Sequence, residues 1–149
     1  MKIALGSDHG GYELKEFIKQ KLLDWDYEVE DFGCFGDESV DYPDFGLKAS
    51  LAVSEKNAER GIVICTTGIG MSIVANKVKG IRAALCYTPW AARMSRRHNN
   101  ANVLVLGAAF AGKKITEEIV RIWLKEEFEG GRHSRRVKKI TDIERSNSV

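Results

Sequence analysis

Residues 61–70 read Gly-Ile-Val-Ile-Cys-Thr-Thr-Gly-Ile-Gly, an apolar run that ends at Cys65 and passes directly into a polar turn. A short apolar run bounded by such a turn is typical of a strand that is buried on both faces. Met71–Val78 then has the pattern of a helix, and Gly80 stands where a C-cap glycine would end it. This stretch therefore predicts one strand–turn–helix unit of a parallel sheet.

The same alternation of apolar runs and helical patterns continues on both sides of this unit. The expected strands are Lys2–Leu5, Tyr27–Phe32, Gly61–Cys65, Ile81–Cys86 and Asn102–Leu106. The expected helices are a first one that carries Leu14, Phe17, Ile18 and Leu22, followed by Pro43–Lys56, Met71–Val78, Pro89–Arg97, Lys113–Phe128 and Arg132–Ile143.

Five strands, each followed by a helix, predict an α/β fold in which helices cover both faces of a parallel sheet and a last helix stands at the C-terminus. The commonest doubly wound order for five strands is 2-1-3-4-5, and we expect that order. No linker or repeat divides the 149 residues. We therefore expect a single domain over 1–149, in which 129–149 form a basic helical extension.

Composition and charge exclude several classes of protein. The formal net charge is only +2, which gives no sign of a nucleic-acid or membrane partner. The basic stretch 129–149 holds six Arg and Lys against three Asp and Glu. The three cysteines form no CxxC pair, so neither a disulfide framework nor a metal site is expected. The first residues lack the apolar run of a secretory signal, and we expect a cytoplasmic protein.

Ligands of doubly wound sheets bind beyond the carboxyl ends of the strands, where the winding direction reverses. Here that place lies between the first and third strands. The residues that follow these strands are Ser7–Gly11 and Cys65–Gly70, which hold a carboxylate, an imidazole, a thiol, hydroxyls and glycines. The sequence therefore predicts that a ligand site forms between these two loops.

Within this site, Cys65 precedes the first turn of a helix, whose partial positive charge would favour a thiolate. Thr66–Gly70 resembles a backbone cradle for an anion, although it matches no complete phosphate-loop motif. Each feature also has a plain structural explanation, because buried cysteine is usually a small apolar residue and glycine often serves a tight turn. Arg132 and Arg136 lie four residues apart, so they share one helical face and could hold a phosphate together or form a solvated basic face.

Seven segments, in this order along the chain, carry a resemblance to a known family: Gly6–Gly11, Asp41–Pro43, Ile64–Ser72, Ala75–Lys77, Gly80–Ala83, Ser95–Asn99 and Glu129–His133. With these segments the sequence resembles the type B ribose-5-phosphate isomerase family, which also includes galactose-6-phosphate and allose-6-phosphate isomerases. The resemblance covers essentially the whole chain. It implies an aldose–ketose isomerase that needs no cofactor and no metal, and whose site is shared between the subunits of a homodimer, or of a dimer of dimers.

The resemblance also implies roles for individual residues in the reaction. Cys65 matches the base that removes the proton from carbon. Thr67 and the backbone N–H groups of Gly68, Ile69 and Gly70 match the groups that stabilise the enediolate.

Other matched positions bind or open the sugar. His98 matches the residue that promotes ring opening. The sugar-contacting positions of the family match Asp8, His9 and Asn99, and we count Asp8 with the catalytic residues. The phosphate ligands of the family match Arg132 and Arg136.

Two positions depart from the family pattern. Members often carry glycine where this chain has Thr66. The threonine adds a side chain beside the cradle, and we count it with the substrate-binding residues. Many members place an arginine where this chain has Ala109, so one phosphate contact is missing.

The expected function is the interconversion of ribose 5-phosphate and ribulose 5-phosphate. One alternative is the isomerisation of a six-carbon sugar phosphate, such as allose 6-phosphate or galactose 6-phosphate, by the same residues. Another is a non-catalytic module that binds a sugar phosphate or a nucleotide. RNA binding through 132–139 is disfavoured because no aromatic platform accompanies the basic residues.

Overall fold

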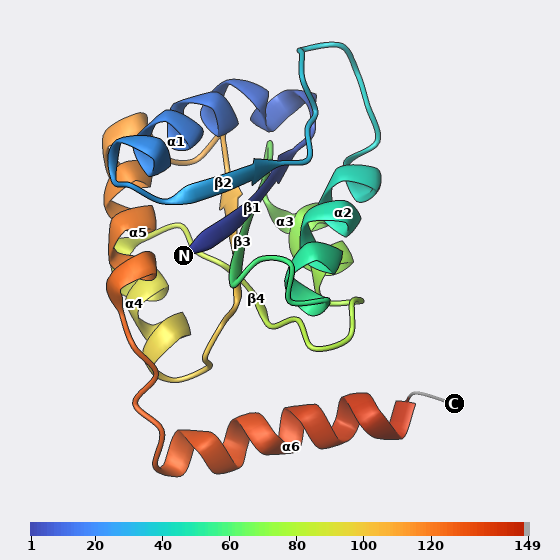
Figure 1. Cartoon of the computed structure of the whole chain (residues 1–149), viewed down its shortest axis with the longest axis vertical. Coiled ribbons are helices and arrows are strands. Elements are labelled where there is room, and N and C mark those ends of the chain that lie inside the picture. The colour runs from blue at the N-terminus through green and yellow to red at the C-terminus, as the bar shows by residue number, and fades with distance from the viewer. Residues whose placement is uncertain (148–149) are drawn as a thin grey trace.

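The computed structural model describes residues 1–147 and has the expected α/β architecture, with helices on both faces of a five-stranded parallel sheet (Figure 1). The strands are β1 (Lys2–Ser7), β2 (Glu28–Asp31), β3 (Arg60–Cys65), β4 (Ala83–Leu85) and β5 (Val103–Gly107). The helices are the short 3-10 turn η1 (His9–Gly11), α1 (Tyr12–Asp24), α2 (Tyr42–Ser54), α3 (Ile69–Ala75), α4 (Pro89–Arg97), α5 (Lys113–Lys125) and α6 (Arg132–Asn147).

The order of the strands is 2-1-3-5-4, so the expected positions of the last two strands were wrong. All five residues of β5 are buried, whereas the three residues of β4 are each partly exposed. An apolar strand with no exposed residue belongs between two neighbours, and β5 accordingly lies between β3 and β4. The winding direction still reverses between β1 and β3, because only β4 and β5 have exchanged their expected positions.

Two apolar clusters cover the two faces of the sheet. On one face, α1, α4 and α5 pack against Ile62 and Ile64 of β3. On the other face, α2 and α3 pack against Val63 and Cys65. Successive residues of a strand point to opposite faces, which explains why this run is apolar throughout. The side chain of Cys65 therefore points to the side of the sheet that α2 and α3 cover.

The end of α3 differs most from the expected boundaries. The helix expected at Met71–Val78 ends earlier, and Gly80 does not cap it. Asn76 follows the helix, and its side chain accepts a 2.9 Å hydrogen bond from the backbone N–H of Ala83 and donates one of 3.0 Å to the oxygen of the same residue. The side chain of Asn76 thus joins the end of α3 to the start of β4. This strand is shorter than the expected Ile81–Cys86.

The last helix, α6, lies apart from the layers of the fold and runs along one end of the molecule (Figure 1). His133 is its only buried residue among those described. The apolar side chains Ile140 and Ile143 are 48% and 60% exposed. A cavity of about 630 Å³ separates this helix from the loop that contains Arg82. Among residues 1–147, no helix has the length and apolar character that crossing a membrane requires.

Candidate active site

The two loops that follow β1 and β3 pack against each other at the carboxyl edge of the sheet. The backbone N–H of Asp8 donates to the oxygen of Ile64 at 3.2 Å. A Cβ atom added to Gly10 would lie 2.1 Å from the hydroxyl oxygen of Thr66, so a larger residue there would displace the Thr66 side chain. The structure thus brings together the loops predicted to form the site, with Cys65 at their junction.

Cys65 is the last residue of β3 and is 5% exposed. Its sulfur accepts a 3.1 Å hydrogen bond from the backbone N–H of Gly68. Gly68 has a φ of 81°, and a Cβ atom there would lie 2.4 Å from a methyl carbon of Leu85, so the turn requires glycine. A backbone N–H aimed at the sulfur would stabilise negative charge on that atom.

Hydrogen-bond donors lie next to this sulfur. The Oγ1 atom of Thr67 accepts a 3.1 Å hydrogen bond from the N–H of Ile69, which leaves the hydroxyl hydrogen available to a ligand. The N–H groups in the first turn of α3 have no acceptor within the helix. This corner of the molecule can therefore offer several donors to an oxyanion.

Two tyrosines that received no role from the sequence complete this corner. The ring of Tyr42 covers Gly70, where a Cβ atom would lie 2.6 Å from the ring. The hydroxyl of Tyr87 donates to the backbone oxygen of Thr67 at 2.7 Å, and its ring lies 4.9 Å from that of Phe110. The motif Asp41–Pro43 had marked the first tyrosine as part of the resemblance, but no sequence pattern marked the second.

Asp8 and His9 each have a structural contact in addition to their expected role. The Oδ1 atom of Asp8 caps η1 by accepting a 3.0 Å hydrogen bond from the N–H of Gly11. The Nδ1 atom of His9 accepts a 3.1 Å hydrogen bond from the N–H of Val40, so a neutral His9 carries its proton on Nε2. That Nε2–H is free to serve as a donor for a ligand.

The remaining predicted residues lie at the opposite edge of the sheet. His98 is the C-cap of α4, and this helix runs antiparallel to the strands, as the crossover helices of parallel sheets do. Asn102, four residues further on, accepts a hydrogen bond from the N–H of Gly61 near the start of β3. The length of β3, about 13 Å from Gly61 to Cys65 at 3.3 Å per residue, therefore separates the two groups. Within one chain, His98 and Cys65 do not meet.

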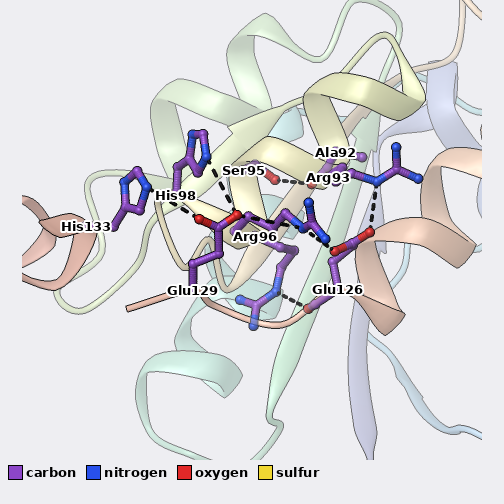
Figure 2. Close-up of polar contacts among 9 residues, drawn as sticks. Ala92, Arg93, Ser95, Arg96, His98, Glu126, Glu129 and His133 are labelled. Carbon is purple, nitrogen blue, oxygen red and sulfur yellow. Dashed lines mark hydrogen bonds and ion pairs between the residues drawn. The ribbon is translucent and has the colours of Figure 1, made fainter. Parts of the chain in front are cut away.

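The second group is built where α4, the loop after α5 and α6 meet. The backbone N–H of Glu129 donates to the oxygen of Arg97 at 3.0 Å, which anchors the start of this segment. Figure 2 shows the rings of His98 and His133 side by side with the carboxylate of Glu129 below them. Asn99, Arg132 and Arg136 are exposed at this edge. The two arginines extend from the first turns of α6.

His133 is 5% exposed, and the sequence analysis gave it no role although it lies in one of the segments that carry the resemblance. Burial lowers the pKa of its imidazole, and the nearby positive or protonatable groups His98, Arg132 and Arg136 lower it further against the opposing effect of Glu129. These surroundings disfavour the protonated form of His133.

Ala109 lies at the carboxyl edge, where its backbone N–H donates to the oxygen of Thr66 at 2.9 Å. An arginine at this position would extend from the rim of the Cys65 group. The position that departs from the family pattern thus belongs to that group, whereas Arg132 and Arg136 belong to the other one.

Comparison with known proteins identifies the family. A sequence model of the Ribose/Galactose Isomerase family matches residues 3–140. Ribose-5-phosphate isomerase B of Escherichia coli strain K12 is 46% identical over 143 residues, which cover 96% of this chain and 96% of that protein. The chain therefore belongs to the Ribose/Galactose Isomerase family.

Solved structures agree with this assignment over nearly the full length. Ribose-5-phosphate isomerase B from Clostridium thermocellum is similar with a TM-score of 0.98 and 58% sequence identity, covering 99% of this chain and 100% of that one. The enzyme from Mycoplasma genitalium, solved with bound ribulose-5-phosphate, has a TM-score of 0.93 and 40% identity, covering 98% of this chain and 97% of that one.

Proposed function

We propose that the protein interconverts ribose 5-phosphate and ribulose 5-phosphate, with Cys65 as the base that moves a proton between C1 and C2. The names of the relatives support the substrate class. The observation that carries the assignment of the base is the hydrogen bond from the Gly68 amide to the Cys65 sulfur, because it favours a thiolate next to a set of oxyanion donors.

The chemistry follows from these contacts. In the direction from aldose to ketose, the thiolate takes the proton from C2, and the resulting thiol returns a proton to C1. The hydroxyl proton on O2 passes to O1 in the same conversion, so that C2 becomes the carbonyl carbon. The intermediate is an enediolate, whose negative oxygen needs fixed donors. The hydroxyl of Thr67 and the amide of Gly70 can supply them, whereas the amides of Gly68 and Ile69 already donate to the Cys65 sulfur and to Oγ1 of Thr67. Losing one such donor typically costs about 3–4 kcal/mol.

The residues around His98, at the opposite edge of the sheet, supply ring opening and phosphate binding. His98 exchanges a proton with the ring oxygen of the cyclic aldose, because an imidazole titrates in a suitable range. Arg132 and Arg136 hold the phosphate and use its binding energy to keep the reacting carbons in register. Asp8, His9 and Asn99 contact the sugar hydroxyls.

Because the two groups lie at opposite edges of one chain, the complete site requires a second copy. We propose a homodimer in which Cys65 of one subunit faces His98 and the arginines of the other. Exposed apolar side chains support an interface near the first group: Ile69 and Ile73 of α3 are 52% and 58% exposed and share one helical face.

An isomerase assay on purified protein tests the proposed function. We expect turnover of ribose 5-phosphate and slower turnover of allose 6-phosphate and galactose 6-phosphate. Faster turnover of a six-carbon substrate would reassign the sugar. Binding of ribose 5-phosphate without turnover, and without exchange of solvent deuterium into C1 of ribulose 5-phosphate, would show a non-catalytic binding module instead.

A further inference from the structure

The rings of His98 and His133 stack with their centroids 4.2 Å apart and their planes 10° apart. The carboxylate of Glu129 faces both rings, with 3.9 Å from Oε1 to Nε2 of His98 and 3.7 Å from Oε2 to Nε2 of His133. The His133 ring is buried, and its Nε2 atom has no hydrogen-bond partner among the described residues. Burying such an atom without a partner is costly, so this arrangement needs an explanation beyond stability.

One candidate explanation is a metal site, because one ligand atom from each of these three residues lies within 4.8 Å of the others. Two observations argue against it. A metal ion lies about 2 Å from each imidazole nitrogen and close to the plane of that ring, which two parallel stacked rings do not allow. The Nε atom of Arg97 also lies 3.9 Å from Oε1 of Glu129, so the carboxylate already has a cationic neighbour.

We propose instead that His133 is a positioning residue for His98. The buried ring provides a fixed flat surface against which the half-exposed ring of His98 rests, and the carboxylate of Glu129 orients the Nε2 edges of both rings in one direction (Figure 2). His98 follows the last turn of α4, where a side chain without such support would sample several rotamers. This inference rests on the proposed role of His98 in ring opening.

The lowered pKa of His133 fits this role. A second imidazolium stacked on His98 would repel a protonated His98, and burial together with the surrounding guanidiniums disfavours that charge on His133. A positioning residue must fix the ring of His98 and must not compete for its proton.

The decisive experiment compares two activities in a His133→Ala variant. Ribose 5-phosphate is mainly a closed ring, whereas ribulose 5-phosphate has no free C5 hydroxyl with which to close a five-membered ring. We expect kcat for ribose 5-phosphate to fall about tenfold or more, because a well-placed general acid contributes about 10²–10⁴-fold. Its KM and the exchange of solvent deuterium into C1 of ribulose 5-phosphate should stay near the wild-type values.

Two further variants separate positioning from a structural role. His133→Phe keeps a stacked ring without the nitrogen atoms, and it should recover most of the lost kcat. His98→Ala combined with His133→Ala should lose no more than His98→Ala alone, since residues that act through one group are not additive. Lys139→Ala, an exposed change on the same helix, serves as the control and should leave both activities unchanged.

A failure of the proposed function and a failure of the positioning role give different results in these experiments. If the wild-type protein itself shows no deuterium exchange at C1, the proposed function fails. If His133→Ala, or His133→Phe where the alanine variant does not fold, loses turnover and exchange in equal measure, the positioning role is overturned. An additive loss in the double variant would overturn it as well.

Discussion

The sulfur of Cys65 and the backbone N–H of Gly68 form a 3.1 Å hydrogen bond across the turn that joins β3 to α3. Only a residue that adopts a φ of 81° can direct its amide back to the sulfur in this way. The glycine in the turn therefore has a chemical consequence as well as a geometric one. It directs a hydrogen-bond donor at the sulfur of Cys65, the atom that we propose as the base.

Replacement of Cys65 by alanine should lower kcat by at least about 100-fold, because a general base is lost. Substrate affinity should change little, since the phosphate ligands belong to the other group. Steady-state kinetics and equilibrium binding of ribose 5-phosphate measure the two effects separately.

Cys86 provides the matched control for this change. It also lies at the end of a strand, but burial raises the pKa of its thiol to about 11, and the thiol is therefore protonated at neutral pH. Cys86→Ala should keep most of the activity. Comparable losses in the two variants would show that Cys65 has no special role.

Replacement of Arg136 by alanine should raise KM about 10- to 100-fold and leave kcat nearly unchanged, because one charge-assisted hydrogen bond to phosphate is removed. The control is Arg135→Ala, a change at a residue that is also exposed and whose side chain points about 100° around the helix. Initial rates over a range of ribose 5-phosphate concentrations test the prediction. A fall in kcat without a change in KM would contradict it.

The pair of Lys15 and Asp31 links stability to pH. Lys15 is fully buried, and its Nζ atom lies 2.6 Å from Oδ2 of Asp31. Burial acts to raise the pKa of Asp31, but hydrogen bonds from Lys15, the Gly33 amide and Lys19 outweigh it and hold the pKa below its usual range. A lowered folded-state pKa stabilises the protein above the unfolded value of about 3.9, and this stabilisation is lost as the pH falls through the folded value.

Asp31→Asn should therefore lower the free energy of unfolding at pH 7 by about 3 kcal/mol, because it removes the buried carboxylate and leaves the buried Lys15 with only the partly exposed Glu16 as a carboxylate partner. The difference from the wild-type protein should narrow below about pH 4. Urea unfolding at several pH values provides the measurement. Asp142→Asn removes the exposed Asp142–Lys138 pair and should cost less than about 1 kcal/mol at either pH. An equal loss in both variants would contradict this account.

The sequence predicted the class of fold and the loops of the Cys65 group because both depend on local patterns. Apolar runs followed by glycine turns mark the carboxyl ends of β1 and β3, and parallel strands bring these ends to one edge. The exchange of β4 and β5 was missed because the commonest order was assumed. The short, weakly apolar β4 and the uniformly apolar β5 carried the signal that would have corrected it.

Other parts of the site depend on tertiary contacts that no local pattern shows. Tyr87 reaches Thr67 from 20 residues away, and the stacking of His133 on His98 depends on how α6 leaves the domain. The separation of His98 from Cys65 could, however, have been predicted from the sequence. A residue at the end of a crossover helix lies at the opposite edge from a residue at the end of a strand.

The central claim is that a complete site combines Cys65 of one subunit with His98 of another. Cys65→Ala and His98→Ala, each inactive alone, should regain activity when the two variants are unfolded and refolded together. Half of the resulting dimers would be mixed, and each mixed dimer would hold one intact site of two, so we expect about one quarter of the wild-type rate. A refolded mixture as inactive as its two components would contradict the shared site.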